Sequence, residues 1–175
     1  MKKRILSITL LLISAITAII AADYASINGD ALSLLNKQTD QVSILYDTDD
    51  ASINGKTYKA YKQSLNAKQS SKYDADIIKL KQYIVKQFNQ ANKQGFQLTD
   101  QGANFTAQVN IKKLSFTEGK GRAKITAAID IRENDSPQII TQIRLTDFEG
   151  GKKSGTLKQL QQLTKDIIEY LTIYL

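Results

Sequence analysis

Three neighbouring segments in the second half of the chain alternate apolar and polar residues, and this pattern constrains the fold more than any other feature. Apolar residues occupy every second position from Phe105 to Ile111 and again from Ala123 to Ile131, and a third segment follows at Ile139 to Leu145. Because successive side chains of a strand point to opposite faces, each segment predicts a strand with one buried face. Glycine- and proline-containing turns separate the segments, so we predict an antiparallel meander.

Other segments have apolar residues at helical spacing. Residues Tyr73 to Gln94 place them on one helical face, and the segment after Thr156, its predicted N-cap, does the same towards the C-terminus. The last residues, from Tyr170 on, also alternate like a strand, but their continuity with the preceding apolar stripe favours a helix. A shorter helix is predicted over Thr57 to Leu65.

Short strands over Val42 to Tyr46 and Phe96 to Thr99 complete the set of elements. The order is therefore a strand, helices, a short strand, the three-strand meander and a final helix. Each long helix has a single apolar stripe, as a helix lying on one face of a sheet does. We predict an α+β fold, with a single antiparallel-rich sheet backed by two main helices, the last of them C-terminal.

The start of the chain has the composition of a secretory signal peptide. The basic residues Lys2 to Arg4 precede an apolar run that ends in small residues at Ala22, where cleavage is expected. The alternative, an uncleaved membrane anchor, usually has a longer apolar run. We therefore predict residues 1–22 as a signal peptide, 23–41 as a mobile N-terminal segment and 42–175 as a single domain, located in the periplasm or secreted.

The composition of the chain limits its chemistry. Without cysteine it can form no disulfide and carry no lipoprotein acyl group, and without histidine it has neither a Ser-His-Asp nor a Cys-His catalytic set. The usual zinc and copper ligands are missing too, so we predict no cofactor and no metal. The leader holds three of the 24 basic residues and no acidic residue. The chain without the leader therefore has 21 basic and 17 acidic residues, and its net charge is +4 instead of +7. This excess favours anionic partners only modestly.

The glycine-rich loop before the last helix is the candidate binding site. It consists of Gly150, Gly151, Lys152, Lys153, Ser154 and Gly155. Free backbone N–H groups and the positive dipole end at a helix start attract anions, and the two lysines add charge. The spacing differs from that of a phosphate-binding Walker loop. We predict a contact with an anion or a partner here, and the alternative is a flexible connection between strand and helix.

Two further patterns also have structural explanations. Residues Asp50 to Gly55 resemble the start of a calcium loop, but Tyr61 stands where a bidentate Glu is required, so a turn is predicted instead. Residues Tyr58 to Lys62 interleave tyrosines with lysines, as in surfaces that stack on sugars or bases, but a short amphipathic helix is favoured.

Three motifs carry a resemblance to known proteins: Val42 to Asp47, Ile53 to Gly55, and Gly150 to Lys152 leading to Gly155 and Thr156. The chain resembles small secreted envelope proteins of the Bacteroidetes whose function is uncharacterised, from Gly29 to the C-terminus. Its expected fold is also similar to the periplasmic α/β domain of lipoproteins that activate penicillin-binding proteins or build the curli secretion channel. The chain lacks their acylated cysteine and pore-forming insertion, so the resemblance implies an envelope domain that binds or scaffolds.

These observations favour a binding module over an enzyme. We predict a non-catalytic exported binding or scaffolding module of the bacterial cell envelope, whose partner is an envelope protein or an anionic envelope polymer. Nucleic acid is not expected as a partner, and no stable membrane span is expected after leader cleavage. The alternative is a carboxylate-dependent hydrolase acting on an envelope polymer, for which Asp47, Asp49 and Asp50 form the only dense acidic cluster. Such an enzyme needs two carboxyl groups in one cleft.

Overall fold

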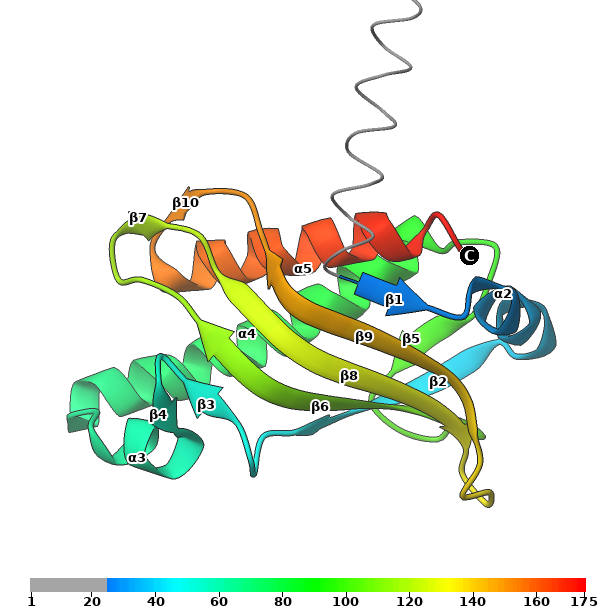
Figure 1. Cartoon of the computed structure of the whole chain (residues 1–175), viewed down its shortest axis with the longest axis horizontal. Coiled ribbons are helices and arrows are strands. Elements are labelled where there is room, and N and C mark those ends of the chain that lie inside the picture. Colours follow the sequence, from blue (N-terminus) through cyan, green and yellow to red (C-terminus); the bar gives the residue numbers. More distant parts are fainter. Residues whose placement is uncertain (1–24) are drawn as a thin grey trace, which may run out of the picture.

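The computed structural model describes residues 25–175. The predicted signal peptide and the first two residues of the predicted mobile segment lie outside the described residues. Figure 1 shows a twisted sheet with two long helices behind it. The predicted α+β class, the element order and the C-terminal position of the last helix are confirmed.

The predicted meander forms the centre of the sheet. Strand β6 (Phe105–Ser115) pairs antiparallel with β8 (Lys124–Glu133), which pairs antiparallel with β9 (Ile139–Glu149). Apolar positions of neighbouring strands lie opposite one another, for example Val109 opposite Ile129. Because this register aligns the apolar sets, one face of the meander is apolar.

The remaining strands extend the sheet at both edges. Strand β2 (Gln41–Asp47) lies parallel to β6, and β5 (Gln97–Thr99) lies parallel to β2 on its other side. The pairing of β2 with β5 is parallel because the chain crosses over between them through helices instead of a hairpin. Strand β1 (Ala25–Ile27) pairs with β9 at the opposite edge, so the order is β1-β9-β8-β6-β2-β5.

The described part of the predicted mobile segment 23–41 contains regular structure. Besides β1 it holds helix α2 (Gly29–Gln38), whose first turn is capped by the Asn28 side chain, which accepts a hydrogen bond from the Ala31 N–H. An isolated helix of this length is unstable in water, and burial of Leu32 and Leu35 against the sheet supplies the stability. Mobility of the segment stays a prediction.

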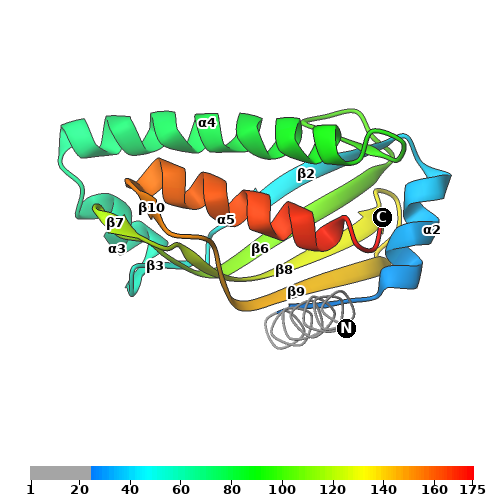
Figure 2. The ribbon, with the colours of Figure 1, turned by 90° about the horizontal axis from the view of Figure 1, so that it is seen from above.

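Both long helices lie side by side on one face of the sheet (Figures 1 and 2). Helix α4 (Ala67–Ala91) begins before the predicted Tyr73, because Asn66 and Gln69 form a reciprocal capping box. Within residues 25–175, no helix covers the opposite face of the sheet.

Helix α5 (Thr156–Leu171) is the predicted C-terminal helix, but the predicted cap is wrong. Its N-cap residue is Gly155, which supplies no side-chain hydrogen bond. The Thr156 hydroxyl instead donates to the Thr117 carbonyl oxygen, because the loop before β7 (Lys120–Gly121) lies against the helix start. Strand β7 pairs there with β10 (Lys153–Ser154).

A small hairpin and helix follow β2. Strands β3 (Ser52–Ile53) and β4 (Lys56–Thr57) are joined by the predicted Asn54-Gly55 turn, with φ of 49° and 79°. This left-handed backbone is the one that an Asn-Gly hairpin turn adopts. Helix α3 (Tyr58–Gln63) follows directly and is shorter than predicted.

Buried side chains form two clusters in the layer between helices and sheet. One includes Leu160 and Leu163 of α5 with Phe148 of β9, and the other includes Phe88 of α4 with Phe96 before β5. The core is therefore divided along the length of the sheet.

Candidate functional site

The sheet face beneath the helices has small side chains at its centre. Ala107 of β6 lies opposite Ile131, and Ala127 of β8 lies opposite Leu145. Each alanine side chain is smaller than the one opposite it, so it leaves space unfilled above the sheet. The floor of the helix–sheet layer is therefore recessed along these two strands.

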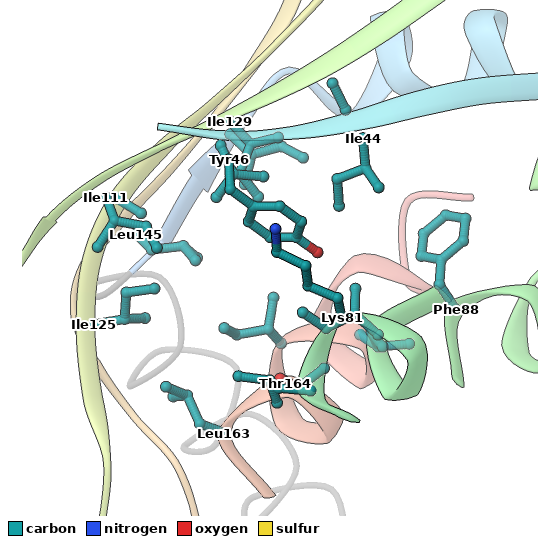
Figure 3. Close-up of a pocket in the computed structure, with 18 of the residues that line it drawn as sticks. Ile44, Tyr46, Lys81, Phe88, Ile111, Ile125, Ile129, Leu145, Leu163 and Thr164 are labelled. Atoms are coloured by element: carbon teal, nitrogen blue, oxygen red, sulfur yellow. The ribbon is translucent and has the colours of Figure 1, made fainter. Parts of the chain in front are cut away.

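Helices α4 and α5 do not fill this recess, and a cavity of about 300 Å³ lies between them and the sheet. Figure 3 shows side chains from both layers around it. Its roof includes Ile77, Leu80 and Ile84 of α4 and Leu163 and Ile167 of α5. The three α4 side chains belong to the apolar stripe of that helix but are only partly buried. The cavity is bordered by residues of both core clusters.

Tyr46 brings a polar group into this apolar space. Its side chain extends from β2 into the cavity (Figure 3), and its hydroxyl is buried without a hydrogen-bond partner among the described residues. Burial, and then the negative charge of Asp100, raises the pKa of Tyr46, so the hydroxyl keeps its proton at neutral pH and can donate it in a hydrogen bond. An unsatisfied buried hydroxyl costs about 1–3 kcal/mol. A ligand atom that accepts this bond would remove that cost.

Lys81 lies where the cavity meets solvent. It lines the cavity from α4 but is itself exposed. Its Nζ lies 5.0 Å from the centre of the Tyr46 ring, a cation–π contact, and Figure 3 labels both side chains. Among residues 25–175, no carboxylate lies within ion-pair distance of this ammonium group. Lys81 therefore offers a positive charge over the ring of Tyr46.

The first half of the predicted loop site packs inside the protein. Gly150 is buried, and a Cβ there would lie 2.6 Å from the Leu163 Cα, so only glycine allows α5 to approach this closely. The Gly150 N–H donates to the Ala123 carbonyl oxygen at 3.0 Å. The Gly151 N–H donates to the Asp166 carboxylate at 2.7 Å. These donors are already used, so they do not form an anion cradle.

The second half of the loop faces solvent. Lys152, Lys153 and Ser154 are exposed, and the Gly155 N–H donates to the Gly119 carbonyl oxygen. The loop is a strand-to-helix connection through β10, and none of its six predicted residues lines the cavity. An anion or partner contact at Gly150, Gly151, Lys152, Lys153, Ser154 and Gly155 stays a prediction that rests on the two lysine side chains.

The acidic cluster of the hydrolase alternative lies along an exposed turn. Asp47 ends β2, and its carboxylate accepts a hydrogen bond from the Asp49 N–H. Asp49 and Asp50 are exposed, and Asp50 is 3.7 Å from the Lys112 ammonium group. None of the three lines the cavity. They do not form the shared cleft that carboxylate catalysis requires.

The two remaining patterns have structural roles. The Asn54 side chain accepts a hydrogen bond from the Phe116 N–H at 2.8 Å, which fixes the β3–β4 turn to the end of β6. The Tyr61 ring contacts the rings of Tyr73 and Phe116 edge-on, at 5.6 and 6.1 Å between centroids. Tyrosines of the predicted short helix therefore pack inward, as expected for an amphipathic face.

The described residues contain neither a group of three or more acidic side chains placed to hold a metal ion nor a helix long and apolar enough to cross a membrane.

Two solved structures have a related arrangement of elements. The PelC dodecamer from Paraburkholderia phytofirmans has a TM-score of 0.40 at 9% identity, over 79% of this chain and 89% of that chain. A single-substitution variant of that dodecamer has a TM-score of 0.39 at 10% identity, over 77% and 84%. Similarity at this level is a loose likeness of fold and carries no argument about function. No protein-family model and no curated protein matches the chain.

The cavity was missed by the sequence analysis, although part of its signal is present. Ala107 and Ala127 stand in the alternating apolar pattern, where larger residues would fill the layer. Tyr46 is the one polar-tipped side chain on the inward face of β2, after Val42 and Ile44. None of these three residues indicates a cavity by itself, because helices that packed closer to the sheet would leave no space above them.

Proposed function

We propose that this chain is a non-catalytic binding module that holds an apolar ligand in the cavity between α4, α5 and the sheet. The observation that supports the proposal is the cavity itself, with its mainly apolar lining and the buried, unpartnered hydroxyl of Tyr46. Its volume of about 300 Å³ lies at the lower end of ligand-binding pockets. Under the predicted export of the chain, the ligand belongs to the cell envelope.

The energetic cost of an empty cavity supports this proposal. Closed core cavities cost about 24 cal/mol per Å³, and this cavity costs less than a closed void of the same volume because it meets solvent beside Lys81. Domains have a total stability of about 5–15 kcal/mol. A bound apolar ligand would restore the lost packing contacts, and this gain in stability supports the proposal that the cavity holds a ligand.

The lining also favours binding over catalysis. Within residues 25–175, its polar members are the tyrosines Tyr46, Tyr58 and Tyr73, two threonines and Lys81, with no carboxylate. A pair of carboxyl groups for acid and base catalysis therefore has no place in it. A second contact, of Lys152 and Lys153 with an envelope protein or an anionic polymer, is a separate proposal.

A cavity-filling variant tests the proposal. Ala127→Leu should fill the space from β8, whereas Ala128→Leu adds the same side chain at the next position, on the opposite face of the sheet. The delipidated purified protein is titrated with the neutral fluorescent probe N-phenyl-1-naphthylamine. We expect saturable binding by the wild type and by Ala128→Leu, and affinity lower by about tenfold for Ala127→Leu.

Two results would contradict the proposal. One is the absence of saturable probe binding by the folded wild-type protein. The other is equal affinity of Ala127→Leu and the wild type, which would place the probe elsewhere on the surface. Urea unfolding of both variants controls for folding, and we expect Ala127→Leu to be at least as stable as Ala128→Leu because it fills empty space.

A further inference from the structure

We infer that the ligand is a single-chain amphiphile with an anionic carboxylate head group, its tail in the cavity and its head between the Tyr46 hydroxyl and the Lys81 ammonium group. This inference rests on the proposed function and specifies the ligand class of the same site. The inference has three grounds: the positions of the polar lining groups, the place where the cavity reaches solvent, and the kind of head group that can accept hydrogen bonds from both Tyr46 and Lys81.

Three of the six polar lining residues lie on the side of β2. Tyr46 lies in β2 and Thr48 just after it, and Lys81 of α4 reaches over the Tyr46 ring. The other three are Tyr58, Tyr73 and Thr164 of α5, and the rest of the lining is aliphatic or phenylalanine. The charged lysine and the unpartnered hydroxyl therefore lie on one side of a mainly apolar lining, a distribution that suits an amphiphile.

The sheet provides access to solvent at the same place. Strand β5 pairs only with Gln41 to Ser43, so β2 from Ile44 to Asp47 has no neighbouring strand on that side within residues 25–175. Lys81, on the helix above, is exposed. A ligand that enters between this edge and α4 leaves its head group beside Lys81.

Lys81 and the Tyr46 hydroxyl both favour a head group that accepts hydrogen bonds, and the charge of Lys81 favours an anion. Burial, and then the negative charge of Asp100, raises the pKa of Tyr46, and that charge acts against an anion. The Tyr46 hydroxyl needs an acceptor, since it is buried without a partner among the described residues, and Lys81 has no ion-pair partner there. A carboxylate accepts from both, and hydrogen bonds to ionised groups are the stronger ones. A cationic head would be repelled by Lys81. The cavity volume of about 300 Å³ leaves room for one medium-length chain.

Competition experiments test the head group. Decanoate, decanol, decyltrimethylammonium and decyl phosphate share one tail and are used to displace the neutral probe. We expect decanoate to compete more strongly than decanol by roughly threefold to fivefold, the strength of a partly exposed ion pair. The ammonium compound should compete least. Stronger competition by decyl phosphate than by decanoate would overturn the carboxylate assignment.

Lys81→Gln removes the charge and keeps much of the side-chain length. We expect it to lose the preference for decanoate over decanol while binding decanol as the wild type does. Lys79→Gln is the matched control, because Lys79 is an exposed lysine of α4 that does not line the cavity. Lys81→Arg should restore the preference. An equal loss in Lys79→Gln and Lys81→Gln would attribute the preference to general charge and overturn the inference.

The two proposals fail in different ways. If the neutral probe does not bind, the proposed function fails. If the probe and decanol bind and are weakened by Ala127→Leu, but decanoate competes no better than decanol, only the head-group inference fails.

Discussion

Helix α4 turns the same apolar periodicity towards the sheet at its centre and at its C-terminal end, yet the side chains at the C-terminal end are more deeply buried. At the C-terminal end, Phe88 also lines the cavity, but it is 6% exposed and stacks on Phe96, with 5.2 Å between ring centroids. In the central part, Leu80 and Ile84 are only partly buried and border the cavity. An amphipathic stripe therefore shows which face of a helix turns inward, but not whether the layer beneath is full.

Polar contacts sharpen this difference. Asn89 donates to the Leu98 carbonyl oxygen and accepts from the Leu98 N–H, at 3.0 and 2.7 Å. Asn92 donates to Asn36 of α2 and to the Phe96 carbonyl oxygen, at 2.8 and 3.0 Å. These bonds hold the C-terminal half of α4 against β5. By contrast, the buried hydroxyl of Tyr46 in the cavity makes no hydrogen bond to any of the described residues.

The largest expected effect is at the packed end. Phe88→Ala removes a buried ring and leaves a void, which should lower the free energy of unfolding by about 3–5 kcal/mol. The measurement is urea denaturation followed by circular dichroism. A loss no greater than that of Leu80→Ala would break the comparison between the C-terminal end and the centre of α4.

A smaller effect is expected for Leu80→Ala in the ligand-free protein. The side chain is partly exposed and already borders empty space, so its loss removes fewer contacts, and we expect a cost of about 1–2 kcal/mol. The same denaturation experiment measures it. Close packing around Leu80 would instead raise the cost to that of Phe88→Ala.

The smallest effect is expected at Tyr46 and has the opposite sign. Tyr46→Phe removes a buried hydroxyl that has no partner among the described residues, so it should raise the stability of the ligand-free protein by about 1 kcal/mol. It should also weaken decanoate binding, because the donor to the head group is lost. A destabilised ligand-free Tyr46→Phe protein would show that the hydroxyl is already satisfied.

The sequence predicted elements better than it predicted the site. Alternation located β6, β8 and β9, because a half-buried strand repeats every two residues regardless of its neighbours. The start of α4 was placed too late because Asn66 and Gln69, which cap it, lie in a polar stretch without apolar periodicity. Helix α2 was not predicted because its stability comes from docking of Leu32 and Leu35.

For the candidate site, sequence proximity was a poor guide. The residues from Gly150 to Gly155 are neighbours in the chain, but half of the loop packs against α5 and β8 and its glycines serve close approach. The cavity residues Tyr46, Lys81 and Ala127 are far apart in the sequence and meet only through the sheet order and the position of α4. Their chemistry becomes apparent only when they lie together.

The sequence by itself determined the α+β class, the apolar face of each strand and helix, and the chemistry that the absence of histidine and cysteine excludes. These properties depend on local periodicity and composition. Only the tertiary structure decided that β2 is parallel to β6, that α4 is more deeply buried at its C-terminal end, and that a cavity with the unpartnered hydroxyl of Tyr46 remains beneath the helix. A cavity is the volume that distant side chains leave unfilled, so no local pattern encodes it.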